Sequence, residues 1–103
     1  MDRVQKLKDF LQKSPNDSFL RHALALEYIK AGEDKAAREE FEGLLANDPA
    51  YVGSYYHLAK LLERTGTTQE AVAVYETGIE QAKKAGDMHA LGELRGAYEE
   101  FIF

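Results

Sequence analysis

The stretch LALEYIKAGEDKAAREEFEGLLANDP, residues 24–49, decides the fold because its apolar residues recur at three- and four-residue steps. A glycine interrupts this stretch at position 32, and a proline closes it at position 49. Residues 58–83 read LAKLLERTGTTQEAVAVYETGIEQAK, with similar spacing and a glycine at position 66. Each stretch therefore predicts two helices joined by a short turn.

The same helical spacing continues through the rest of the chain, and no segment alternates for long enough to indicate a strand. The expected helices cover about residues 4–13, 17–31, 34–46, 52–65, 67–85 and 87–103. Because connections of only a few residues force each helix to fold back on its predecessor, we expect antiparallel pairs.

Several residues are typical of helix ends. Pro15 ends the first helix because the residue before a proline is disfavoured in the helical conformation. Asp17 and Asp87 can accept a hydrogen bond from a free backbone N–H in the helix that follows. Thr67 and Glu70 have the T-x-x-E spacing of a capping box. The glycines at positions 32, 66 and 86 can adopt the left-handed conformation that closes a helix.

One set of residues recurs at an interval of 34. The pairs are Pro15 and Pro49, Leu24 and Leu58, Ala25 and Ala59, Gly32 and Gly66, Ala37 and Ala71, and Phe41 and Tyr75. So many matches in one register predict repeated helical hairpins. The alanines are expected where two helices approach closely, since a larger side chain there would cost ~1–3 kcal/mol. The expected core around them consists of Leu24, Tyr28, Phe41, Tyr55, Leu58, Leu62 and Tyr75.

These residues resemble the tetratricopeptide repeat. In the first repeat the resemblance rests on Leu24, Ala25, Tyr28, Ala37, Phe41 and Pro49; in the second it rests on Tyr55, Leu58, Ala59, Ala71, Tyr75 and Gly78. Arg21 and Leu44 depart from the first pattern, and Leu62 and Lys83 from the second. The missing proline at Lys83 suggests that the fifth helix runs past the usual end.

The resemblance implies an all-α fold, a right-handed α-solenoid of antiparallel helix pairs with about six helices, in a single domain over residues 1–103. Residues 1–14 would match the second half of a repeat through Leu7, Phe10 and Leu11. Residues 18–51 and 52–85 would be the two repeats, and residues 87–103 a C-terminal capping helix.

The resemblance also implies a function. In this family the first helices of successive hairpins line a concave groove that holds peptides or partner helices. The implied groove residues are Phe19, His22, Leu26, Ile29, Lys30, Tyr56, Lys60, Glu63 and Arg64. Alternatively, neighbouring helices cover Leu26 and Ile29. The clamp for chaperone C-termini is not expected, because the two asparagines of the chain, Asn16 and Asn47, lie in turns.

The last helix allows two interpretations. Its apolar stripe, which comprises Leu91, Leu94, Tyr98, Phe101 and Ile102, would cover the end of the repeats while charged residues face water. Alternatively, the last helix is the surface of a weak homodimer, formed by Gly92, Gly96, Phe101 and Phe103. Two glycines four residues apart leave space for another backbone, although each costs a helix interior ~1 kcal/mol.

Composition restricts the remaining functions. The 103 residues include no cysteine, and the net charge of −5, with a pI of about 5.2, disfavours nucleic acid as a partner. Residues 1–13 carry four basic and two acidic side chains, which indicates a basic helix on an acidic body or a weak site for an acidic partner. The chain shows neither a signal peptide nor a membrane span, so a soluble cytoplasmic protein is expected.

No chemistry is predicted. The three histidines, His22, His57 and His89, fall on different expected helices without ligand spacing, so neither a metal nor a cofactor is expected. Adjacent glutamates on a helix do not share a face, so Glu39–Glu40 and Glu99–Glu100 are not a catalytic pair. The sequence thus predicts a non-enzymatic module that binds a protein or peptide of unknown identity. The alternative is a structural module that associates with itself and takes no separate ligand.

Overall fold

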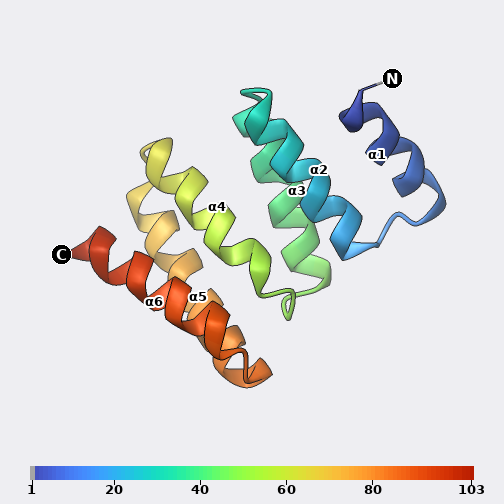
Figure 1. Ribbon diagram of the computed structural model, residues 1–103. Helices are drawn as coiled ribbons and strands as arrows, with labels where there is room; N and C mark the ends of the chain where they lie inside the picture. The colour runs from blue at the N-terminus through green and yellow to red at the C-terminus, as the bar shows by residue number, and fades with distance from the viewer. Residues whose placement is uncertain (1) are drawn as a thin grey trace. The chain divides into compact units, whose positions relative to one another are not determined.

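The computed structural model describes residues 2–103 (Figure 1). Over these residues the chain forms six α-helices and no strand: α1 (Arg3–Lys13), α2 (Ser18–Lys30), α3 (Asp34–Asn47), α4 (Gly53–Arg64), α5 (Thr68–Ala85) and α6 (Met88–Ile102). The helix bounds expected from apolar spacing agree with these to about one residue, and the all-helical prediction is confirmed. The fifth helix is the longest, at 18 residues, as the missing proline suggests.

The chain divides into two compact units. The first contains α1–α3 and ends at Asp48, and the second runs from Pro49 to Phe103 and contains α4–α6. The boundary falls between the two hairpins, so each unit holds one complete hairpin and one further helix.

In the first unit, α2 and α3 form an antiparallel hairpin, and α1 lies beside α2 (Figure 1). Ala25 and Ala37 have no exposed surface, in agreement with the expected close approach of the helices. Phe41 is fully buried, and the His22 ring meets it edge-on with 5.8 Å between centroids. These residues and the buried Leu24 form the core of this unit.

At position 21 the repeat pattern usually has an aromatic residue, whereas this chain has Arg21, which makes polar contacts instead. The Arg21 Nε donates to the carbonyl oxygen of Pro15 at 2.8 Å, and Nη1 lies 3.2 Å from Glu40 Oε1. Ser18 adds a hydrogen bond to Asp48 at 2.6 Å. Together these contacts hold the start of α2 against both the preceding turn and α3.

In the second unit, α4 and α5 form the hairpin and α6 packs mainly on α5. Ala59, Ala71 and Tyr75 have no exposed surface. Gly78 is also buried, and a Cβ built on it would lie 2.6 Å from Tyr55 Cβ. The α4–α5 hairpin therefore closes around a position that admits no side chain.

The helix ends agree with the sequence in most places. Asp17 Oδ1 accepts from Leu20 N at 3.1 Å, and Asp87 Oδ1 accepts from Ala90 N at 3.0 Å. The three turn glycines have φ between 67° and 83°. The capping box at Thr67 is wrong: its hydroxyl donates back to Leu62 O at 3.2 Å instead of accepting from the first turn of α5.

Phe10 differs from its expected place among the core residues of the first helix. Leu7 is buried and Leu11 is partly buried, whereas Phe10 is 57% exposed. Phe10 lies at the edge of the apolar face of α1, and α2 covers only the centre of that face. The sequence pattern was too broad here because one neighbouring helix covers a narrower strip than the pattern spans.

Candidate partner-binding surface

The first candidate stripe lies on α2. Phe19, His22, Leu26 and Ile29 are spaced so that they share one helix face. Phe19 is 68% exposed, whereas Leu26 and Ile29 are only partly exposed. Leu26 and Ile29 were expected either to be covered by neighbouring helices or to line an exposed groove. Neither expectation holds fully, because neighbouring helices cover part of each side chain and leave the rest accessible.

The polar members of the α2 stripe have partners inside the first unit. The edge-on contact with Phe41 orients the His22 ring. Lys30 Nζ lies 3.3 Å from Glu27 Oε2, and Glu27 Oε1 lies 3.0 Å from Arg3 Nε. Arg3 therefore links α1 to the end of α2, and Lys30 presents an exposed ammonium group beside the apolar stripe.

The second candidate stripe lies on α4 and consists of Tyr56, Lys60 and Glu63. Lys60 Nζ lies 5.9 Å from the centroid of the Tyr56 ring and 3.7 Å from Glu63 Oε1. Contacts of this kind between a cation and a ring, and between successive turns, restrict the side chains. The exposed Arg64 follows at the end of the helix. The α4 stripe is thus a connected polar and aromatic surface.

Glu63 also accepts a hydrogen bond from the Tyr75 hydroxyl on α5. Burial of the ring, and then this bond to a carboxylate, raises the pKa of Tyr75 well above its ordinary range. The Tyr75 hydroxyl is protonated at neutral pH with or without this shift, and its hydrogen bond holds the carboxylate of Glu63 in place within the stripe.

The structure places all nine predicted groove residues on the first helices of hairpins, five on α2 and four on α4. The α2 residues belong to the first unit and the α4 residues to the second. One continuous groove lined by both helices stays a prediction.

The predicted dimer surface on α6 has two different parts. A Cβ on Gly92 or Gly96 would meet nothing within 4 Å, and Phe103 is 96% exposed. Phe101, by contrast, packs inward, with its ring centroid 6.2 Å from that of Tyr75. Three of the four residues are therefore accessible, and Phe101 serves the interior of the second unit.

Three accessible apolar residues lay outside the predicted sites, and one of them is Ile102, which is 41% exposed. Met88, at the start of α6, is 62% exposed, and Phe10 on α1 is exposed as described above. In sequence Phe10 resembled a core residue, and Met88 was hidden because it lies outside the apolar stripe of the last helix. The angle of each apolar residue around its helix axis would have placed Phe10 at the edge of its apolar stripe and Met88 beyond the edge of its own.

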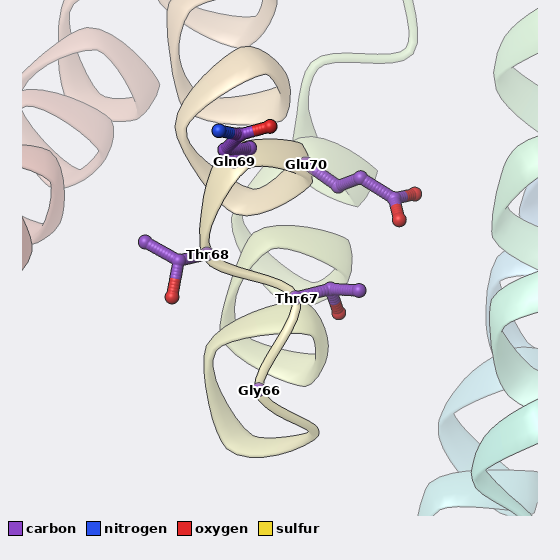
Figure 2. Close-up of a pocket in the computed structure, with 5 residues that line it drawn as sticks. All are labelled: Gly66, Thr67, Thr68, Gln69 and Glu70. Carbon is purple, nitrogen blue, oxygen red and sulfur yellow. The ribbon is translucent and has the colours of Figure 1, made fainter.

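A hollow of about 360 Å³ lies at the turn between α4 and α5, lined by Gly66, Thr67, Thr68, Gln69 and Glu70 (Figure 2). A helix N-terminus attracts anions, but Glu70 places a carboxylate on the rim, and the Thr67 hydroxyl already donates to Leu62 O. Figure 2 shows the Thr67 and Thr68 side chains pointing in different directions rather than converging. We assign no ligand to this hollow.

The described residues show neither a metal site nor a membrane span. No group of three or more histidine, aspartate or glutamate side chains within residues 2–103 is arranged to hold a metal ion. Among the helices of that range, none combines the length and apolar character needed to cross a bilayer.

His57 on α4 gives a prediction for pH dependence. Burial lowers the pKa of His57 below its ordinary value of 6.5, and the nearby carboxylate of Glu93 on α6 offsets part of this effect. The folded state binds the His57 proton more weakly than the unfolded state does. The contribution of His57 to the free energy of unfolding is therefore complete above pH ~6.5 and is lost as pH falls toward the lowered pKa. We expect the free energy of unfolding, measured by urea titration, to decrease as pH falls through this range.

The matched variant is His57→Gln, which keeps a polar side chain that does not titrate. Its free energy of unfolding should depend less on pH between about 7.5 and 5, because the imidazole that binds the proton is absent. Identical pH profiles for the two proteins would contradict the prediction.

Three comparisons agree with the helical hairpins described above. A tetratricopeptide repeat model matches residues 52–84, which span α4 and nearly all of α5. A TPR repeat-containing protein of Pseudomonas aeruginosa is 28% identical over 91 residues, which cover 88% of this chain and 87% of that protein.

Two solved structures are also similar. The crystal structure of a tetratricopeptide repeat domain protein from Salinibacter ruber is 44% identical, covers 82% of this chain and 94% of its own, and has a TM-score of 0.79. The solution structure of a Bordetella parapertussis protein, at 24% identity and a TM-score of 0.83, covers 99% and 89% and is similar in fold alone. These matches confirm the helical solenoid class: the chain belongs to the tetratricopeptide repeat family.

Proposed function

We propose that the protein holds a peptide or a partner helix against the stripes of α2 and α4. Membership of a family of generally non-enzymatic interaction scaffolds supports a binding role. The observation that carries the proposal is the α2 stripe, where the exposed Phe19 continues into the partly exposed Leu26 and Ile29. Apolar residues at such helical spacing are the contact that a partner helix uses in a groove.

The α4 stripe suits the polar part of such a partner. Lys60 and Glu63 offer opposite charges, and Tyr56 offers an aromatic surface that loses little conformational entropy on binding. Tyrosines of this kind are frequent among the residues that dominate binding energy. The expected ligand therefore has an apolar face flanked by charges of both signs.

The test is to select binding peptides from a displayed random library and to measure their affinity for the protein and for two variants. Leu26→Glu and Tyr56→Glu should each weaken binding at least tenfold, about 1.4 kcal/mol, because a buried carboxylate would replace an apolar contact. Ala73→Glu is the matched control, since it adds the same charge at an exposed position of α5. Selected peptides that bind all three variants equally would exclude these stripes as the site.

A second candidate function is self-association without a separate ligand, through the last helix or the groove. The exposed Met88 on α6 and Phe103 just after its end, together with the open space at Gly92, favour it. A tight dimer that survives dilution and protects Tyr56 from modification would support self-association through the groove. A cytoplasmic location stays a prediction of the sequence.

A further inference from the structure

One face of α6 stays open within the second unit. The opposite side, which packs on α5 and α4, carries the buried residues Ala90, Leu94 and Ala97. At roughly 100° per residue, Met88, Leu91 and Ile102 share the open face. Met88 is 62% exposed and Ile102 41% exposed, whereas Leu91, at the edge of the face, is partly exposed. Exposed apolar patches of this kind often mark sites of interaction.

Two charged residues of opposite sign occupy the middle of this face. Arg95 and Glu99 are one helical turn apart, and both are exposed. Within residues 2–103 neither forms an ion pair with another side chain. Three glutamates and one arginine give α6 a net charge of −2, but Glu93 and Glu100 lie more than a quarter of a turn from Met88 around the helix. The open face itself is therefore neutral.

This pair of charges restricts which helix can cover the face. A helix with charges of one sign would set a like charge against either Arg95 or Glu99, and such contacts are unfavourable. A second α6 in the antiparallel direction avoids this, because it presents a glutamate where the first presents an arginine. The open face of α6 is thus complementary to itself.

The apolar residues and the charges of the face require the same register. A two-fold axis at the level of Ala97 brings Arg95 of each copy level with Glu99 of the other. The same axis brings Leu91 of each copy to within one residue of Ile102 of the other. Leu91 and Ile102 lie on the same side of the face, so they meet across the axis. One alignment therefore satisfies both kinds of contact.

We propose that two copies of this chain form a symmetric dimer through antiparallel α6 helices. Arg95 of each copy pairs with Glu99 of the other, and Leu91 packs against Ile102. Met88 extends the apolar contact at both ends of the interface. The proposal rests on self-association, the second candidate function, and adds its surface, orientation and register; it does not depend on the stripes of α2 and α4.

Such an interface is isologous, because the same surface of both copies meets, and every contact occurs twice. One helix on one helix is a small interface, so the association is expected to be weak and to grow with concentration. Sedimentation velocity up to about 1 mM protein covers the range of weak complexes.

Reversing one charge at a time tests the pairing of Arg95 with Glu99. R95E sets two carboxylates against each other at both contacts, and E99R does the same with two guanidinium groups. Each variant should associate about tenfold more weakly than the parent chain, or weaker still. The double variant R95E/E99R restores opposite charges and should associate as the parent chain does. Both positions are exposed, so all three variants should keep the helical circular dichroism of the parent chain.

The equimolar mixture of R95E and E99R is the decisive sample. One copy then offers two carboxylates on this face and the other two guanidinium groups, so the mixture should form a one-to-one complex. R38E and E42R are the matched controls, because Arg38 and Glu42 have the same spacing on α3. These two variants should leave association unchanged.

Cross-linking tests the orientation of the two helices, since the chain contains no cysteine of its own. A mixture of L91C and I102C should form disulfide-linked dimers under mild oxidation. Neither variant alone should do so, because in the antiparallel pair equivalent positions lie roughly 15 Å or more apart along the helices, too far for a disulfide.

Four results would overturn the proposal. A parent chain that remains monomeric at the highest concentration excludes self-association, and with it the second candidate function. Equal association of the parent chain, R95E and E99R leaves self-association in place but moves it to another surface. A loss of association that R95E/E99R does not restore excludes the pairing of the two charges. Cross-linking of L91C without I102C indicates parallel helices and excludes the register.

Discussion

Gly78→Ala should destabilise the second unit by about 1–3 kcal/mol, although alanine is the better helix former. The added Cβ would lie 2.6 Å from Tyr55 Cβ and 2.9 Å from Tyr55 Cγ. These atoms sit at the base of the tyrosine side chain and cannot swing away, so α4 and α5 must separate. Urea unfolding followed by circular dichroism measures the loss.

The chain provides its own control for this experiment. Gly92 and Gly96 also lie inside a helix, but a Cβ on either would meet nothing within 4 Å. Gly96→Ala should therefore stabilise the protein by about 0.5–1 kcal/mol, the ordinary helix-propensity gain. If Gly78→Ala also stabilises the chain, the close contact between α4 and α5 is wrong.

Phe41→Ala should cost about 3–5 kcal/mol, a large part of the 5–15 kcal/mol that stabilises a typical domain. Phe41 has no exposed surface, and its ring also supports the edge-on contact of His22. Truncation leaves a cavity between α2 and α3 that the surrounding helices can fill only in part. The free energy of unfolding, obtained from a denaturant titration, gives the effect directly.

Phe19→Ala is the comparison variant, because it removes the same ring from an exposed position of the same unit. We expect it to change stability by no more than about 0.5 kcal/mol, as is usual for surface substitutions. Similar losses for Phe41→Ala and Phe19→Ala would mean that the first unit is not organised around Phe41.

The candidate site was less predictable than the fold. The stripe residues Tyr56, Lys60 and Glu63 follow from helical spacing, and their contacts with one another are local. The contact of Glu63 with Tyr75 joins residues twelve positions apart on different helices, which spacing within one helix does not reveal. The hydrogen bond from Tyr98 to Glu76 at 2.9 Å, across α6 and α5, escaped prediction for the same reason.

Sequence alone determined the helices, most of their ends and the repeat. Periodic apolar residues, turn glycines and capping aspartates act through neighbours within a few positions, so their effects are visible in the order of residues. The alanines at 34-residue intervals also marked the close approaches correctly, because only a small residue fits where two helices meet.

Tertiary structure alone decided how far each apolar side chain is covered and which polar groups find distant partners. Phe10 resembled a core residue but is exposed, since burial depends on whether a second helix lies over that side of α1. The Tyr98 hydroxyl finds Glu76, 22 positions away in sequence, because α6 packs on α5. The burial of an apolar side chain and the distant partner of a polar group depend on the positions of other helices in space. The spacing of residues within one helix does not encode those positions.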